Sequence, residues 1–410
     1  MSIIPRSVLT RTFRKILHPI PVVLEASGPN GLAIIRGLGA KGIQSVALSS
    51  HRAAFGFKSR HSVAALCPDP QQEPQRLVEF LCALGACFPQ RGVLFLTDDT
   101  YLSVVSKNQS LLEKHFDFPF SPWSTLHLLM DKKRQIETAM SLGIAVPRTI
   151  FVSELQSGEL EAALDEMEYP AILKGQFGKA FSSSVGRQVL VVQSAREAIE
   201  KLEKTIECDS ILQEIIPGRD DCLYTVGSYL ASDGTPVGVF TGRKLRQRPR
   251  DFGTSRAAEA LFLPELAQCA IRLLRSFGYH GVSQVEFKKD PRNGQYKLIE
   301  INARYWMWHS LATACGVNLA YLQYSEAVLG TRRVARHQCR CAKKWYMSFV
   351  DVPMSLSEIL TGRLSVRSWA STLSLNAVDA VVSWRDPLPS IMVLAKVLRA
   401  IARNIRRRLA

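Results

Sequence analysis

The stretch 282–304 has the sequence VSQVEFKKDPRNGQYKLIEINAR. Glu286 and Glu300 belong to two apolar, strand-like runs, 282–287 and 296–302, and turn-forming residues fill 290–294 between them. This pattern predicts a β-hairpin. Side chains two residues apart share one face of a strand, so Glu300 and Asn302 lie on the same side, and the hairpin can bring Glu286 beside them.

The polar groups of this hairpin suit a hard divalent cation. Two carboxylates, Glu286 and Glu300, and the amide oxygen of Asn302 are oxygen ligands of the kind that Mg²⁺ (or Mn²⁺) takes, usually together with phosphates. Arg304 continues the same face and is suited to an anion. An isolated acidic pair more often forms a solvated strand face. The metal interpretation therefore depends on further residues upstream.

The composition is that of a globular protein with a basic balance. The chain has 410 residues, enough for two or three domains, of which 47% are hydrophobic and 21% charged. No apolar run approaches the ~18–20 residues of a membrane-spanning helix. Nine cysteines without CxxC spacing favour a reduced, cytoplasmic location.

The positive charge is concentrated near the C-terminus. The net charge is +16, and residues 331–410 hold 15 Lys and Arg against 4 Asp and Glu. We therefore expect a basic C-terminal extension over 331–410, which can meet an anionic membrane, a nucleic acid or an acidic partner. Residues 1–20 form a basic lead-in, for which we favour a surface helix or a disordered segment over a transit peptide.

Residues 21–125 have the pattern of an α/β domain. Predicted strands at 21–26 and 45–48 flank a predicted helix at 32–38, and this βαβ unit indicates a parallel sheet. The glycines of the first turn lack the full spacing of a dinucleotide-binding loop. A further strand over 92–99 ends in polar residues, where ligands of open α/β sheets often bind.

From about residue 126 the pattern changes to α+β. A predicted helix begins at Asp131, and predicted strands follow at 171–175, 189–192 and 211–216. Asp233-Gly234 indicates another hairpin. We expect a two-lobe α+β domain over 126–330, with its small lobe at about 145–216.

Several residues of this region suit a nucleotide. Lys174 ends an apolar strand before a loop, 175–186, with three glycines and three serines, which can bring N–H groups and hydroxyls to phosphate oxygens. A flexible surface hairpin is the alternative for this loop. Glu214 lies near the end of the next strand, where a carboxylate can accept hydrogen bonds from an adenine amino group or a ribose hydroxyl. Five Lys and Arg lie within 243–250 and suit an anion.

The ordered set of Lys132, Lys174 with its loop, Glu214, the 243–250 run and the 282–304 hairpin resembles the ATP-grasp superfamily of carboxylate–amine (or carboxylate–thiol) ligases. It resembles most closely the branch with carbamoyl-phosphate synthase and biotin carboxylase domains, along with bacterial predicted ATP-grasp carboligases. The resemblance covers roughly residues 22–330. It implies a pre-ATP-grasp α/β domain over 21–125 and an ATP-grasp domain over 126–330.

The resemblance also implies site residues. Lys132 and Lys174 are similar to the two phosphate-contacting lysines, and Ser182 and Ser183 lie in what resembles the mobile flap over the triphosphate. For the nucleoside it implies an adenine edge formed by Glu214 and the backbone of Ile215 and Ile216. It implies a ribose contact at Asp221. The implied Mg²⁺ ligands are Glu286, Glu300 and Asn302. Arg304 is similar to the residue that steadies an acyl-phosphate, and Lys244 or Arg243 to a further phosphate contact.

The activity implied by the resemblance is an ATP- and Mg²⁺-dependent ligation. A carboxylate is activated as an acyl-phosphate and joined to an amine or a similar nucleophile, with release of ADP and phosphate. Two alternatives stay open. One is a small-molecule kinase of the same fold, and the other is a membrane-associated nucleotide-binding or scaffold protein with reduced catalysis.

The C-terminal residues predict an amphipathic helix over about 389–408. Apolar residues repeat at spacings of three and four, and basic residues occupy nearly the opposite face. Peripheral contact with an anionic membrane at its inner face is one interpretation. A helix packed on the body with its basic face in solvent is the favoured one. The expected partners are small carboxylate and amine substrates, with a homodimer as a further option and nucleic acid not expected.

Overall fold

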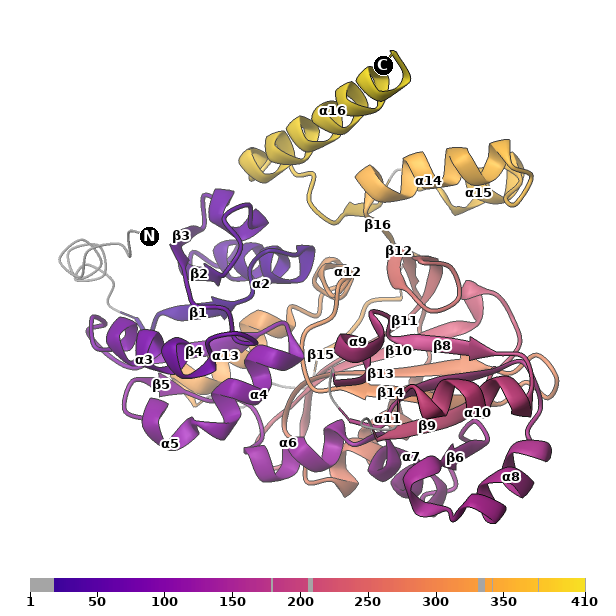
Figure 1. Ribbon diagram of the computed structural model, residues 1–410. Helices are drawn as coiled ribbons and strands as arrows, with labels where there is room; N and C mark the ends of the chain where they lie inside the picture. Colours follow the sequence, from indigo (N-terminus) through magenta and orange to yellow (C-terminus); the bar gives the residue numbers. More distant parts are fainter. Residues whose placement is uncertain are drawn as a thin grey trace.

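The computed structural model describes residues 18–177, 180–205, 209–330, 336–340, 342–374 and 376–409. These residues form three β-sheets with helices packed around them (Figure 1). One sheet comes from the N-terminal part of the chain, a small one from the middle, and a large mixed one from the remainder. The predicted parallel-sheet N-terminal region and the mixed sheet that follows it are both present.

The N-terminal sheet is entirely parallel, with the order β3-β2-β1-β4-β5. Its strands are β1 (Pro21–Leu24), β2 (Ser45–Ser49), β3 (Ser62–Leu66), β4 (Gly92–Leu96) and β5 (Phe116–Asp117). The connecting elements are α2 (Pro29–Gly39), η1 (Phe55–Lys58), α3 (Pro74–Gly85), α4 (Asp99–Lys107) and α5 (Gln109–Leu112). The strand order reverses between β1 and β4. Ligands of open α/β sheets bind beyond the carboxyl ends of strands at such a point.

The small sheet is antiparallel, with the order β6-β9-β7-β8. Its strands are β6 (Thr149–Phe151), β7 (Ala171–Gly175), β8 (Val189–Val192) and β9 (Ser210–Glu214), and its helical elements are η2 (Val152–Glu154), α8 (Ser157–Asp165), α9 (Ala180–Val185) and α10 (Ala195–Glu203). Leu164, Leu173 and Leu212 belong to a hydrophobic cluster of this sheet alone. The small sheet therefore packs as a lobe with its own core.

The large sheet has the order β14-β13-β10-β11-β12-β16-β17, and β15 pairs with β11. Its strands are β10 (Leu223–Leu230), β11 (Pro236–Arg248), β12 (Thr254–Ala260), β13 (Gly281–Lys289), β14 (Tyr296–Asn302), β15 (Arg336–His337), β16 (Lys344–Tyr346) and β17 (Val378–Asp379). Its first two strands are the predicted hairpin. Within it Glu286 pairs directly with Glu300, and Gln284 pairs with Asn302.

Helices join the large sheet to the other two. They are α6 (Trp123–Met130), α7 (Lys132–Ser141), α11 (Pro264–Ser276), α12 (Ser310–Ala314) and α13 (Leu319–Leu329), with η3 (Asp220–Cys222) before β10. Helix α13 contacts β4 of the N-terminal sheet as well as β10, β11 and β13. The N-terminal sheet and the large sheet therefore share hydrophobic clusters.

Residues beyond 330 add strands as well as helices. Strand β16 pairs with β12, and β17 continues the large sheet. The helices are α14 (Ser348–Leu360), α15 (Val366–Thr372) and α16 (Pro387–Leu409), the last where the sequence predicts an amphipathic helix over about 389–408. Among the described residues, no helix is both long and apolar enough to cross a membrane.

A buried ionic cluster joins α14 to the large sheet. Asp351 accepts a bidentate pair of hydrogen bonds from Arg246, both at 2.7 Å, and one from Arg256 at 3.0 Å. The Asp351 and Arg256 side chains are 2% and 3% exposed. A buried charge that loses its partner is strongly destabilising, so Asp351 compensates Arg246 and shares the compensation of Arg256 with Glu358.

We predict that Asp351→Ala lowers the free energy of unfolding by about 3–5 kcal/mol, because it leaves the buried Arg246 guanidinium without its carboxylate and Arg256 with Glu358 alone. Urea unfolding followed by circular dichroism measures this. The control is Glu161→Gln on the exposed side of α8, for which we expect a change within about 0.5 kcal/mol. Equal urea midpoints for the two variants would contradict the prediction.

Candidate functional site

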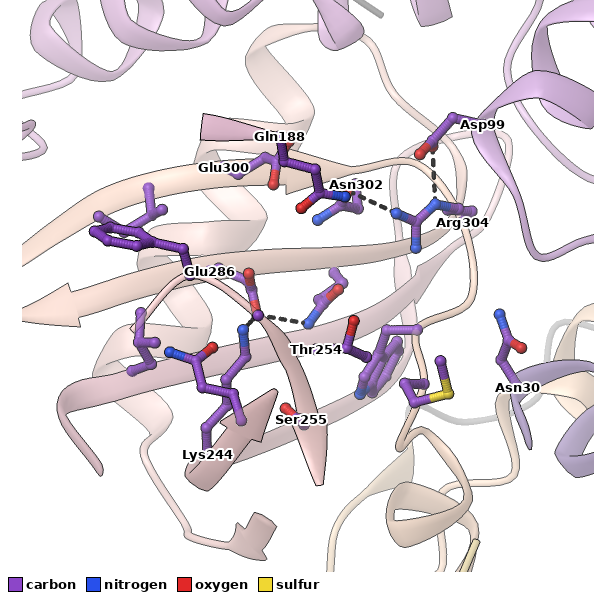
Figure 2. Close-up of a pocket in the computed structure, with 18 of the residues that line it drawn as sticks. Asn30, Asp99, Gln188, Lys244, Thr254, Ser255, Glu286, Glu300, Asn302 and Arg304 are labelled. Atoms are coloured by element: carbon purple, nitrogen blue, oxygen red, sulfur yellow. Dashed lines mark hydrogen bonds and ion pairs between the residues drawn. The ribbon is translucent and has the colours of Figure 1, made fainter. Parts of the chain in front are cut away.

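A pocket of about 530 Å³ lies where the three sheets meet. Its walls come from the carboxyl ends of β1 and β4, from β7 and β8, from the β11–β12 connection, and from the β13–β14 hairpin with the segment that follows it (Figure 2). Every sheet thus contributes side chains. The pocket lies at the switch point of the N-terminal sheet, as expected for an open α/β sheet.

The three predicted metal ligands line this pocket together. Glu286 and Glu300 are cross-strand partners, and Asn302 follows Glu300 on the same face of β14 (Figure 2). No cluster of three or more His, Cys, Asp or Glu suited to a metal occurs among the described residues. The candidate donor set is therefore two carboxylates and one amide oxygen. Such hard oxygen donors fit Mg²⁺ when phosphate and water complete the coordination.

Positive charge surrounds the two carboxylates. The Lys244 ammonium lies 2.9 Å from Glu286, and that of Lys132 lies 3.9 Å from Glu300. Burial alone raises the pKa of Glu300, but nearby lysines and Arg304 hold it below its usual value. Glu300 is therefore suited to remain ionised although it stands opposite Glu286. An ionised carboxylate is the form that binds a divalent cation.

Lys174 reaches the same point from the small sheet. Its side chain is buried at the end of β7, and burial, assisted by the charge of Lys132, lowers the pKa of Lys174 to about 8. Two lysines from different lobes thus face Glu300. Without an anion in the pocket they repel each other, so a phosphate chain bound between them would be stabilised.

The basic side chains of the 243–250 run point to different parts of the structure. Lys244 lines the pocket, whereas Arg243 binds Glu259 at 2.6 Å and does not line it. Arg246 turns instead to Asp351. A register shift in the pairing of β11 with β12 between Lys244 and Arg246 separates these two residues. Of the two predicted phosphate contacts, the structure places Lys244 in the pocket.

The predicted nucleoside contacts lie outside the pocket lining. Glu214 ends β9 and binds Lys297 at 2.6 Å and Arg292 at 3.4 Å. Ile215 and Ile216 follow it in the connection to η3, which contains Asp221. None of these four lines the pocket, so their adenine and ribose roles stay predictions.

The predicted loop after Lys174 contains a short helix. Helix α9 includes Ser182 and Ser183, whose side chains lie outside the described part of the structure. The helix is fixed by Phe181, which is 2% exposed and packs on Gly175, where a Cβ atom would lie 2.6 Å from the Cβ of Phe181. The glycines and serines of this segment predict an irregular loop, and packing of the apolar Phe181 side chain orders it as a helix instead.

Arg304 joins the hairpin to the N-terminal sheet. Its Nε donates to Asp99 at 2.8 Å, and its Nη2 donates to Asn302 at 3.2 Å (Figure 2). Burial lowers the pKa of Arg304, but Asp99 and Glu300 raise it overall. The guanidinium is therefore a fixed positive charge between the candidate metal ligands and the N-terminal part of the pocket.

Sequence reasoning missed the N-terminal wall and the aromatic wall. The first holds Glu25 and Asn30 beyond β1 and Thr97 to Asp99 beyond β4. For Thr97 to Asp99 the signal was the polar end of the predicted 92–99 strand, which the sequence places at a possible ligand site without naming the residues. The aromatic wall is Trp306 and Trp308, which lack any turn or charge signal. Gly227 leaves room for Trp306, because a Cβ atom there would lie 1.9 Å from the indole ring.

Comparisons with known proteins add to this geometry. Residues 258–330 match the family model of the carbamoyl-phosphate synthase L chain, ATP binding domain. The chain is 26% identical over 244 residues to D-aspartate ligase of Enterococcus faecium, covering 56% of this chain and 57% of that one. It is 25% identical over 215 residues to the N-terminal section of the carbamoyl phosphate synthase large chain of Aquifex aeolicus, covering 48% and 36%.

Solved structures share the fold. The biotin carboxylase domain of Hydrogenobacter thermophilus 2-oxoglutarate carboxylase superposes with a TM-score of 0.58 at 18% identity, covering 78% of this chain and 72% of that one. An L-amino acid ligase from Bacillus licheniformis gives 0.55 at 14%, covering 76% and 74%. The alignments with the two curated relatives span about half of the first one's length and a third of the second's.

The lowered pKa of Lys174 predicts a pH-dependent stability. Between pH 8 and 10.5 the native state loses the Lys174 proton while the unfolded state retains its own, so the contribution of Lys174 to stability rises with pH. We expect Lys174→Met to be more stable than the parent at pH 8, and this advantage to fall by up to about 1.4 kcal/mol for each pH unit. Urea unfolding of both proteins at several pH values measures it, and a difference that stays constant would contradict it.

Proposed function

We propose that this chain, which belongs to the ATP-grasp superfamily, is a ligase that uses ATP and Mg²⁺ to join a carboxylate to an amine. One observation carries the proposal: a single pocket gathers Glu286, Glu300 and Asn302 together with the lysines at 132, 174 and 244. Oxygen donors beside clustered lysines form the arrangement that a Mg²⁺-bound triphosphate needs.

The proposed reaction has two steps. A substrate carboxylate oxygen attacks the γ-phosphorus of ATP, the bond to the β–γ bridging oxygen breaks, and ADP leaves. The bound amine first loses one proton to water, and its nitrogen then attacks the acyl carbon. Phosphate leaves with the electron pair of the C–O bond, and the nitrogen loses its second proton to water. Held by Glu286, Glu300 and Asn302, Mg²⁺ would supply Lewis-acid stabilisation of the phosphoryl charge.

The lysines act on charge rather than on covalent chemistry. Lys132 and Lys174 face the phosphate chain from the two lobes, and Lys244 stands beside Glu286. Preorganised positive charge of this kind stabilises the charge that develops as the phosphoryl group transfers. Arg304, fixed by Asp99, is placed to hold the acyl-phosphate or the substrate carboxylate.

The N-terminal wall suits the amine. Glu25 and Asp98 line the pocket on the side of the N-terminal sheet. A protonated amine is favoured near carboxylates, and a carboxylate is favoured near Arg304. The relative named D-aspartate ligase supports an amino acid as one of the two substrates. We therefore propose an amino acid, oriented by the acids of the N-terminal wall and by the neighbouring Arg304, as a substrate class.

Glu300→Gln is predicted to reduce ATP turnover at least a hundredfold, since a metal ligand is lost while the shape is retained. Its binding of nucleotide, measured by calorimetry, should no longer depend on Mg²⁺. The matched control is Glu259→Gln, which removes a carboxylate from the same sheet. The Glu259 carboxylate binds Arg243 and does not line the pocket. If both variants lose the same activity, the metal assignment is wrong.

Lys244→Met is predicted to raise the KM for ATP about 10–100-fold, as expected for the loss of a charge-assisted contact with phosphate. The neighbouring Arg243→Met keeps the strand and removes a charge that does not line the pocket, so we expect less than a threefold change. Steady-state kinetics at saturating Mg²⁺ distinguishes the two. Equal effects on KM would place the phosphate contact elsewhere.

The proposed reaction itself is tested by ADP release across pairs of amino acids and small carboxylates, with the amide product detected by mass spectrometry. A ligase requires both substrates for sustained ADP release. A phosphorylated alcohol as product would identify a kinase instead. Nucleotide binding without turnover under every pair would identify a binding protein.

Two further points stay proposals. The first is the division of the chain at 21–125, 126–330 and 331–410, with 331–410 as a basic extension. The second is a homodimer, which is supported by the description of the Hydrogenobacter thermophilus neighbour as a domain dimer. Light scattering of the purified chain measures its mass directly, and a monomer at micromolar concentration would contradict the second.

A further inference from the structure

The C-terminal elements expose most of the large apolar side chains of the described surface. Trp384 is 95% exposed and Leu360 is 87% exposed. Ten exposed side chains of this kind lie within 352–394, and they are Val352, Leu356, Leu360, Val366, Leu373, Val382, Trp384, Leu388, Ile391 and Leu394. Monomeric proteins rarely gather so many exposed apolar residues unless something covers them.

Their helical spacing places these residues in outward stripes. Val352, Leu356 and Leu360 recur every four residues along α14. On α16 the exposed residues at 388, 391 and 394 lie opposite Val393, which is 4% exposed. Figure 1 shows α14 and α15 next to each other and α16 apart from them, all along the upper edge of the molecule. We name the exposed residues of 352–399 the C-terminal surface.

The start of α16 is fixed, so its exposed stripe has a defined direction. Asp386 is buried and accepts hydrogen bonds from Arg36 at 2.9 Å and from Ser59 at 2.8 Å. Lys396 lies over the ring of Phe55 and donates to the carbonyl of Ala53. These contacts hold one side of the helix on the N-terminal part, and they leave the apolar side uncovered.

In this region the acidic side chains are engaged in internal contacts, whereas several basic side chains are exposed to solvent. All four acids of 331–410 are engaged inward: Asp351 and Glu358 with Arg256, Asp379 with the backbone N–H groups of Ser348, Val381 and Val382, and Asp386 with Arg36. Within 352–399, five basic residues are exposed, and they are Arg363, Arg367, Arg385, Lys396 and Arg399. The C-terminal surface is therefore apolar and positive.

We propose that the C-terminal surface docks on an anionic lipid bilayer. Leucine, isoleucine and tryptophan side chains enter the boundary between headgroups and acyl chains, while arginines pair with lipid phosphates. A second copy of the chain would bring two positive surfaces together and would be repelled. A nucleic acid would satisfy the charge but not the aliphatic stripes. None of the ten apolar residues lines the pocket, so docking leaves the pocket accessible.

Vesicle flotation of the full-length chain tests this proposal. We expect the chain to float with vesicles of phosphatidylcholine containing 30% phosphatidylglycerol, and to stay in the lower fraction with pure phosphatidylcholine. Raising NaCl from 0.1 to 0.5 M should weaken binding, because screening shortens the reach of surface charge. Equal binding to both vesicle types, or none to either, would overturn the proposal.

Variants separate the apolar from the charged part. The double variant Leu360→Ser, Trp384→Ser should lower the partition coefficient at least tenfold. Arg363→Gln and Arg367→Gln should each lower it about fivefold at 0.1 M NaCl. The matched control is Met140→Ser, which changes a side chain that is 61% exposed on α7, away from this surface, and should leave partitioning unchanged. Equal loss in the control would overturn the proposal.

Two further measurements test whether the C-terminal surface binds a second copy of the chain or a nucleic acid instead. If light scattering shows a dimer that Trp384→Ser dissociates, the surface binds a second copy and the membrane proposal is wrong. Tighter binding of a single-stranded RNA oligonucleotide than of anionic vesicles would also overturn it. The flotation is done without nucleotide, and Glu300→Gln should float as the parent does. Failure of the ligase proposal would therefore leave this result intact.

Discussion

Two carboxylates that face each other across neighbouring strands repel unless positive charge is held beside them. Glu286 and Glu300 are such a pair, and the positive charge comes from α7, β7 and β11. Lys174 belongs to the small lobe, which has its own core. The placement of that lobe is therefore an electrostatic requirement of the hairpin as well as a matter of packing.

Backbone contacts fix the small lobe in this position. The Lys132 N–H donates to the carbonyl of Gln176, whose side-chain amide donates to Asp131. The start of α7 and the end of β7 are thereby held together, and each supplies one of the lysines that face Glu300. Because both lysines are on ordered elements, the charge around the carboxylates is preorganised, which is the condition under which electrostatic stabilisation is most effective.

Internal ion pairs orient the charged side chains both at the pocket and in the C-terminal region. At the pocket, Asp99 orients Arg304, so the N-terminal sheet sets the direction of a guanidinium that the hairpin supplies. In the C-terminal region, acids turn inward to buried arginines and leave the basic residues on the outside. In both places internal ion pairs determine which charged side chains can contact a ligand or face the solvent.

The sequence by itself determined the local elements and the shared faces. Two strand-like apolar runs and the turn residues between them were sufficient for the hairpin. Because a strand has a period of two, Glu286, Glu300 and Asn302 could be named together. Tertiary structure alone decided the rest. The bulge in β11 sends Lys244 to the pocket and Arg246 to Asp351, although their spacing predicts one face. Glu25, Asp99 and Trp306 entered the site only through the meeting of distant sheets, and β16 joined residues beyond 330 to the large sheet, because such pairing depends on partners far away in the chain.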